Sequence, residues 1–150
     1  MSSVRETMLD TLEQVFRVAV SGSAYQGKIA AITRWRENKL NLDNYRTPFV
    51  AIHDTGRETV LVDDGTDKRL ALDIEFYGFV ASSDARGALS ALNEVAADIK
   101  KFLDSSPSFG TSVLRIRYVS TDHNAISESE AVAACQILAR LTYVVERGVY

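Results

Sequence analysis

Two histidines, each beside an aspartate, are the residues of this chain most able to do acid–base chemistry. His53 precedes Asp54, and His123 follows Asp122. A hydrolase that used such a pair would also need a nucleophile and a group that orients the imidazole. The sequence has no Gly-x-Ser-x-Gly nucleophile motif, and neither histidine has the i,i+4 partner of a helical zinc site. We therefore interpret both pairs as parts of surface turns and predict no catalytic residue.

Three further motifs lack the pattern that ion or cofactor binding requires. Asp63–Asp67 resembles a calcium loop only slightly, because it lacks the spaced carboxylates and the closing glutamate, and a hairpin turn is the better interpretation. Gly22 and Gly27 match neither a P-loop nor a dinucleotide fingerprint. Cys135 lies among small and apolar residues, which favours a buried structural thiol. The sequence thus predicts no metal, no cofactor and no enzyme.

Arginines recur at a spacing of two residues on expected strands, carboxylates do so on the central strand, and aromatic residues lie close to both. Arginines two residues apart lie on one face of a strand, and so do carboxylates at the same spacing. If the strands are neighbours, the two kinds of charge can face each other across a sheet. The residues that form this candidate subunit interface are Arg34, Trp35, Arg36, Asp73, Glu75, Tyr77, Arg115, Arg117 and Arg140.

This charge pattern has two interpretations. In the first, the charges pair on a solvent-exposed face, where each ion pair contributes little to stability. In the second, the face is a subunit interface where the planar guanidinium groups fix the register between copies. Trp35, Tyr77 and Phe79 lie on or near the same polar face and favour the interface.

Length and composition are those of one soluble domain, residues 1–150. A chain of 150 residues can bury about 70% of its unfolded surface. A net charge of −3 argues against a dedicated nucleic-acid-binding protein, which usually has a basic excess. The single cysteine excludes an internal disulfide and fits a reducing cytoplasm. The charged N-terminus predicts no signal peptide, and no membrane span is expected.

Hydrophobic periodicity predicts two helices and a sheet. Residues 70–80 alternate apolar and polar side chains, as in a long antiparallel strand with one buried face. A second helix begins after Asp84 and runs to Leu103, and a first helix begins at Ser2 or Ser3 with Glu6 as capping-box partner. The expected core consists of Leu72, Ile74, Phe76, Leu89, Leu92, Val95 and Ile99.

Shorter strands complete the expected fold. They cover residues 29–36, 49–53, 59–62, 113–120 and 137–147, with turns at Gly56 and at Asp63-Asp64-Gly65. The polar segment 37–47 is long for a connection and is expected to be an exposed excursion. The fold class is therefore α+β, a mostly antiparallel, mixed sheet packed by an N-terminal helix and one long central helix.

The order of these elements resembles the tail terminator proteins of tailed bacteriophages, also called tail completion or tail-to-head joining proteins. The resemblance covers nearly the whole chain. It rests on the N-terminal helix VRETMLDTLEQVF, the basic strand ITRWRE, the proline-initiated strand TPFVAIHD, the central strand LALDIEFYGFV, the helix ALSALNEVAADIKKFL and two closing strands.

The resemblance implies a structural protein of the virion tail or neck, assembled in the host cytoplasm. Members of the family form a hexameric ring that caps the tail tube, stops tube polymerisation and joins the tail to the head connector. The implied partners are further copies of the chain, the tail tube protein and the connector or neck proteins, with the tail sheath protein as a further candidate. Double-stranded DNA would pass through the lumen without specific binding, and acidic residues within 37–43 and 63–67 are candidates to line it.

Two alternatives remain open at this point. The chain resembles in style other neck or baseplate subunits of phage tails and contractile injection devices, and binding to the terminal ring of the tube would favour the terminator. It could also be a small α+β ligand-binding domain or enzyme that uses His53 or His123 in a cleft between protomers. A deep apolar pocket around either histidine would favour that function.

Overall fold

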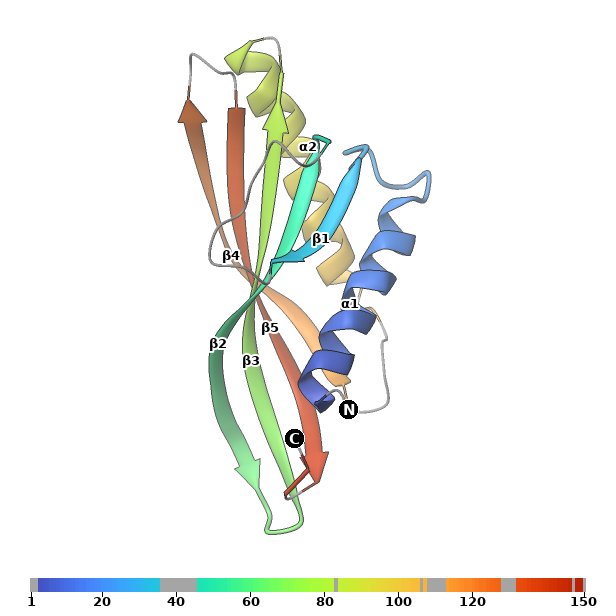
Figure 1. Cartoon of the computed structure of the whole chain (residues 1–150), viewed down its shortest axis with the longest axis vertical. Coiled ribbons are helices and arrows are strands. Elements are labelled where there is room, and N and C mark those ends of the chain that lie inside the picture. Colours follow the sequence, from blue (N-terminus) through green and yellow to red (C-terminus); the bar gives the residue numbers. More distant parts are fainter. Residues whose placement is uncertain are drawn as a thin grey trace.

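Two helices and five strands form the described part of the chain, and both helices lie on one face of the sheet (Figure 1). The computed structural model describes residues 3–35, 46–82, 84–105, 107, 113–127, 132–146 and 148–149. The elements are α1 (Val4–Val20), β1 (Ala31–Trp35), β2 (Phe49–Asp63), β3 (Asp67–Ala81), α2 (Ala85–Asp104), β4 (Val113–Ser127) and β5 (Val132–Glu146). The predicted α+β class is confirmed.

The strands are arranged in the order β1-β2-β3-β5-β4. Only β1 and β2 are parallel, and every other neighbouring pair is antiparallel. Because β1 pairs with residues 49–53 alone, the rest of β2 is an outer edge of the sheet. The end of β2, the following turn and the start of β3 form a hairpin that extends away from α2 (Figure 1). We call residues 58–72 the hairpin arm.

Both helices have the caps that the sequence predicts. The hydroxyl of Ser3 accepts a hydrogen bond from the backbone N–H of Glu6 at 3.1 Å, and the carboxylate of Asp84 accepts one from Gly87 at 2.6 Å. These bonds satisfy backbone donors that a helix start leaves without partners. The buried side of α1 consists of Met8, Leu9, Leu12, Phe16 and Val20.

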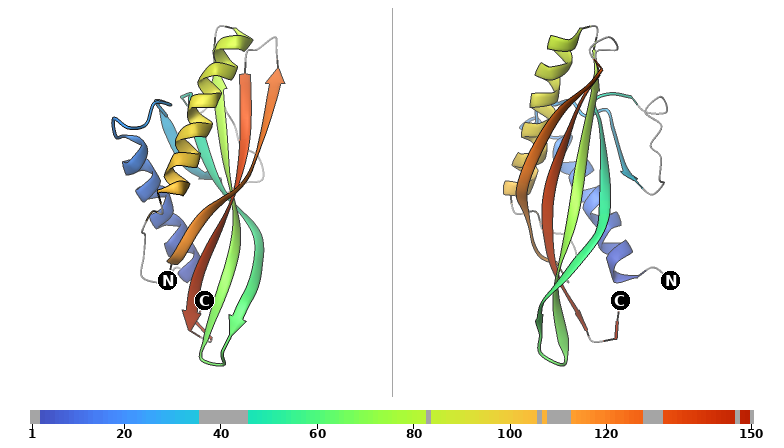
Figure 2. Two further views of the ribbon diagram at one scale, coloured as in Figure 1. Left: turned by 180° about the vertical axis from the view of Figure 1, so that it is seen from behind. Right: turned by 90° about the vertical axis from the view of Figure 1, so that its left-hand side faces the viewer.

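The predicted core is confirmed except at Leu89, which is 43% exposed. Ala88, one residue earlier, is buried, and Leu89 lies about 100° around the helix from it. Figure 2 shows that α1 runs beside only the C-terminal half of α2. Leu89 lies in the N-terminal half of α2, which α1 does not reach, so helical periodicity alone overestimated its burial.

The two strands predicted on either side of Gly56 are one strand, β2, interrupted by a bulge. Asp54 lies opposite Ile74 and Glu58 opposite Leu72, so three residues of β2 face one residue of β3. Gly56 has a φ of 76°, which glycine adopts without strain. Its backbone N–H donates to Asp54 at 2.8 Å. The glycine that indicates a turn in the sequence thus bends a continuous strand.

The last two strands also differ from the predicted ranges. Residues 113–127 and 132–146 form the strands, where 113–120 and 137–147 were predicted. The residues after Ser120 are polar, which is typical of a loop, but β4 is an edge strand and can carry polar side chains. Most of the segment 37–47, expected to be an exposed excursion, lies outside the described residues.

The strand at the centre of the prediction has the predicted faces. Ile74 and Phe76 are fully buried beneath the helices. Gly78 lies on the same face, where an added Cβ would come within 2.9 Å of the sulfur of Cys135. Cys135 is buried as predicted, and burial raises the pKa of its thiol. The thiol is therefore a packing group rather than a nucleophile.

Candidate interaction surface

The sheet face opposite the helices collects most of the candidate interface residues. We call it the open face, because no described helix lies on it (Figure 2). One row of strand partners across it contains Trp35, His53 and Glu75. A second row contains Asp73, Arg140 and Arg117. The predicted alternation of β3 places Asp73 and Glu75 on this face, and their strand partners lie on the same face.

One half of the open face is aromatic. The Trp35 ring lies 5.2 Å from Tyr77 in a T-shaped arrangement and 5.0 Å from His53. Phe49 and Phe79 stack at 5.8 Å beside them. Phe49 and Phe79, with Trp35 and Tyr77 packed against them, belong to a second apolar cluster, separate from the core beneath the helices. The expectation that Trp35, Tyr77 and Phe79 lie on the polar face is confirmed, and we call this region the aromatic half.

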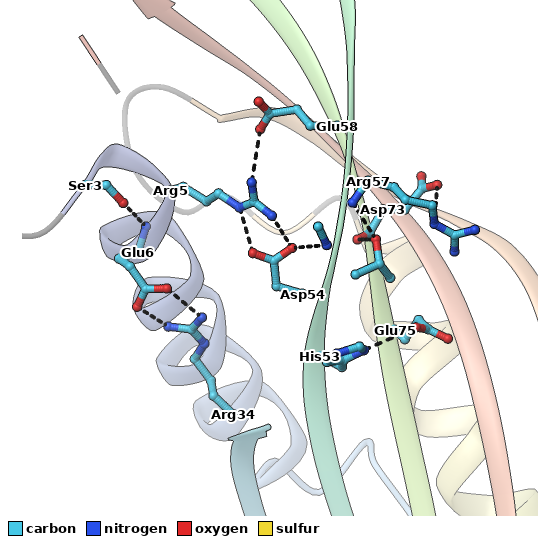
Figure 3. Close-up of polar contacts among 12 residues, drawn as sticks. Ser3, Arg5, Glu6, Arg34, His53, Asp54, Arg57, Glu58, Asp73 and Glu75 are labelled. Carbon is cyan, nitrogen blue, oxygen red and sulfur yellow. Dashed lines mark hydrogen bonds and ion pairs between the residues drawn. The ribbon is translucent and has the colours of Figure 1, made fainter. Parts of the chain in front are cut away.

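Glu75 is buried on the aromatic half, where its carboxylate contacts neighbouring side chains. It is 8% exposed, and it accepts a hydrogen bond from the hydroxyl of Tyr77 at 3.0 Å. Nδ1 of His53 lies 3.2 Å from its other oxygen (Figure 3). Burial and the Glu75 carboxylate raise the pKa of Tyr77 to about 12. Glu75 therefore already has partners within the protomer.

The other half of the open face is rich in arginine. Nε of Arg140 donates to Asp73 at 3.1 Å, and Arg57 approaches the same carboxylate at 3.9 Å. Arg115 and Arg117 are exposed on β4, and neither has a partner among the described residues. Four guanidinium groups thus accompany one carboxylate on this region, which we call the arginine half.

Arg34 is not on the open face, and the expectation that it faces Asp73 or Glu75 is wrong. Its side chain is 7% exposed and reaches α1, where it donates to Glu6 and Asp10 at 2.9 Å each. Side chains alternate along β1, so Arg34 points to the helices where Trp35 points away from them. Figure 3 shows Arg34 directed at Glu6. Arg36 lies outside the described residues.

A second polar network, which the sequence analysis missed, joins α1 to the bulge of β2. Nε of Arg5 donates to Asp54 at 2.6 Å (Figure 3). The hydroxyl of Tyr143 donates to Glu58. Burial alone would raise the pKa of Asp54, but the hydrogen bonds from Arg5 and Gly56 hold it below its ordinary value. No sequence signal marks this network, because it depends on the bulge that aligns Asp54 and Glu58 toward α1.

The histidines do not form the turn pairs that the sequence suggested. His53 lies within β2, and the aspartate that follows it points to the opposite face, toward Arg5. The side chain of His123 lies outside the described residues. Among the residues that the structure describes, no group of three or more His, Cys, Asp or Glu side chains could hold a metal ion. None of the described helices is long and apolar enough to span a bilayer.

Solved structures share this fold over nearly their whole length. A chain from the virion of a native gene transfer agent particle aligns with a TM-score of 0.64 and 14% sequence identity, over 97% of this chain and 100% of that one. A second solved structure, with no functional description, aligns with a TM-score of 0.52 and 13% identity, over 94% and 96% of the two chains. At these identities the likeness shows a common fold. No protein-family model and no curated protein sequence matches the chain.

Proposed function

We propose that this protein is a structural virion protein that terminates a phage tail. In this function a ring of copies, six in the family that the sequence resembles, caps the tail tube, stops tube polymerisation and joins the tail to the head connector or neck. The observation that carries the proposal is the full-length match of the fold to a virion chain. The element order that resembles tail terminators supports the same function independently of that match.

The open face provides surfaces suited to assembly. Aromatic and arginine side chains are enriched at the centres of protein interfaces, where they contribute much of the binding energy. Trp35 and Tyr77 present aromatic rings, and the indole N–H of Trp35 is a buried donor that has no acceptor among the described residues. Arg115 and Arg117 present guanidinium groups without partners among the described residues. We assign the aromatic half to contact with other virion proteins and the arginine half to contact between copies.

An acidic chain suits a conduit for DNA. A net charge of −3 gives the protein no basic excess with which to hold the phosphate backbone. Double-stranded DNA would therefore pass through the ring without specific binding. The partners in this function are the tail tube protein, the connector or neck proteins and, in tails that carry one, the sheath protein.

Control of tube length tests the proposed function. Purified tube protein is polymerised with and without this protein, and tube lengths are measured by electron microscopy. We expect the protein to stop elongation at substoichiometric amounts, because one ring per tube end suffices. Arg86→Glu reverses a charge at an exposed position of α2. This variant is the matched control and should act like the wild type. Tubes that elongate equally with and without the wild-type protein would overturn the function.

A neck or baseplate subunit is the second candidate, because a fold shared with a virion chain fits any position in the particle. Such a subunit would bind the connector or the baseplate and leave tube elongation unchanged. The same polymerisation assay, extended with purified connector, therefore separates the two functions.

A further inference from the structure

The sheet has two outer edges of different character at the level of the hairpin arm. Val60 of β2 lies in one row with Leu70, Tyr143 and Val113, so the free part of β2 and the start of β4 are the two ends of the same row. Neither edge is paired with a further strand in the described part of the chain. A closed ring built from head-to-tail contacts needs two different, complementary surfaces on each copy.

The edge at β2 is apolar and then acidic. Val60, Leu61 and Val62 are 54%, 51% and 49% exposed, although they are consecutive residues of a strand. Every residue from 56 to 66 is exposed, and a second bulge lies between Val60 and Val62. Asp63 and Asp64 follow at the turn, where each uses its Oδ1 atom to accept backbone N–H bonds of the turn.

The edge at β4 is apolar and basic. Tyr118 and Val119 are exposed, and a bulge lies between Tyr118 and Ser120. Arg115 and Arg117 precede them on the same strand. Arg117 lies opposite Arg140, so like charges face each other within the protomer. An external carboxylate would relieve this repulsion.

Asp73 and Glu75, the carboxylates that the sequence analysis paired with the arginines, already have partners within the protomer. Asp73 already binds Arg140, and Glu75 is buried between His53 and Tyr77. Arg34 is also paired within the protomer. Asp73, Glu75 and Arg34 are therefore not the groups that join two copies. The hairpin turn supplies carboxylates that, among the described residues, accept hydrogen bonds from backbone N–H groups alone.

We propose that the β2 edge of the hairpin arm on one copy docks against the β4 edge of a second copy. Leu61 and its neighbours pack on Val119, while Asp63 and Asp64 pair with Arg115 and Arg117. The bulges on both edges exclude a long regular ladder, so side chains rather than backbone hydrogen bonds determine the fit. In this arrangement the acids of the turn serve the subunit contact instead of lining the lumen.

Two variants, each defective in one surface, test the head-to-tail contact. Leu61→Asp damages the arm, and Arg115→Glu with Arg117→Glu reverses the charge of the β4 edge. All three positions are exposed, so thermal melts should match the wild type. In sedimentation equilibrium each variant alone should self-associate at least about tenfold more weakly than the wild type. Val18→Asp, on exposed α1, is the control and should assemble normally.

Mixing the two variants gives the decisive result. Each still has one intact surface, so the mixture should form dimers that contain one copy of each variant and grow no further. Asp63→Arg and Asp64→Arg, added to the chain that carries the two glutamates, should restore assembly beyond dimers. A mixture that stays monomeric, or variants that assemble like the wild type, would overturn the contact.

This inference rests on the ring of the proposed function and can fail separately from tube binding. A wild-type protein that remains monomeric at concentrations up to about 1 mM would overturn the contact, because a weaker association would not be specific. Wild-type rings that obey the mixing test but never stop tube elongation would leave the contact in place and overturn the function.

Discussion

Arg34 is predicted to stabilise the protomer rather than the assembly. It makes three hydrogen bonds to Glu6 and Asp10 and ties β1 to α1. Hydrogen bonds to charged groups contribute about 1.5–3 kcal/mol each when sheltered. The carboxylates of Glu6 and Asp10 are 47% and 50% exposed, so solvent screens the interaction. We therefore expect Arg34→Met to cost about 2 kcal/mol in total, equivalent to a fall in Tm of about 4–8 °C for a chain of this size.

Thermal and urea unfolding of Arg34→Met beside Arg117→Met checks this prediction. Arg117 is exposed and has no partner in the described chain, so the free energy of unfolding of Arg117→Met should lie within about 0.5 kcal/mol of the wild-type value. Methionine keeps most of the apolar stem in both variants, which isolates the loss of the guanidinium group. Equal stability of the two variants would refute the assignment of Arg34 to the interior of the protomer.

Three further predictions concern the core, the pH dependence and the histidines. Ile74→Ala should cost about 2–5 kcal/mol in urea unfolding, and a loss below about 0.5 kcal/mol would remove the proposed core. The pKa of Asp54 is lower in the folded than in the unfolded protein, so its carboxylate stabilises the fold above the unfolded pKa, and this contribution is lost as pH falls through the folded pKa. Arg5→Met should therefore make the free energy of unfolding fall less steeply with acidification below about pH 4. An unchanged slope of that free energy against pH would contradict this prediction. His53→Gln with His123→Gln should leave tube capping intact, because glutamine can still donate a hydrogen bond to Glu75, and Trp35 and Tyr77 remain for contact; lost capping in a folded, assembled protein would contradict this.

The parts of the fold that the sequence predicts well are those with local periodicity. The alternation of residues 70–80 places Ile74 in the core and Tyr77 on the opposite face, because a strand reverses its side chains at every residue. The caps at Ser3 and Asp84 are equally local, since donor and acceptor lie three residues apart.

The parts that the sequence could not predict depend on pairing between distant residues. Gly56 indicates a turn in isolation, and only its opposite strand makes it a bulge. The partner of Arg34 lies on α1, 24 to 28 residues away, which no spacing rule identifies. Leu89 fits the helical stripe of α2, but such a stripe does not show how far the neighbouring elements extend along the helix.

Electron microscopy of isolated tail tubes incubated with the wild-type protein tests the central claim most directly. We predict a closed ring of copies on one end of each tube, with the ring absent from tubes incubated with the Arg115→Glu, Arg117→Glu variant. Tube ends that remain bare at saturating concentrations of folded wild-type protein would contradict the assignment of this protein as a tail terminator.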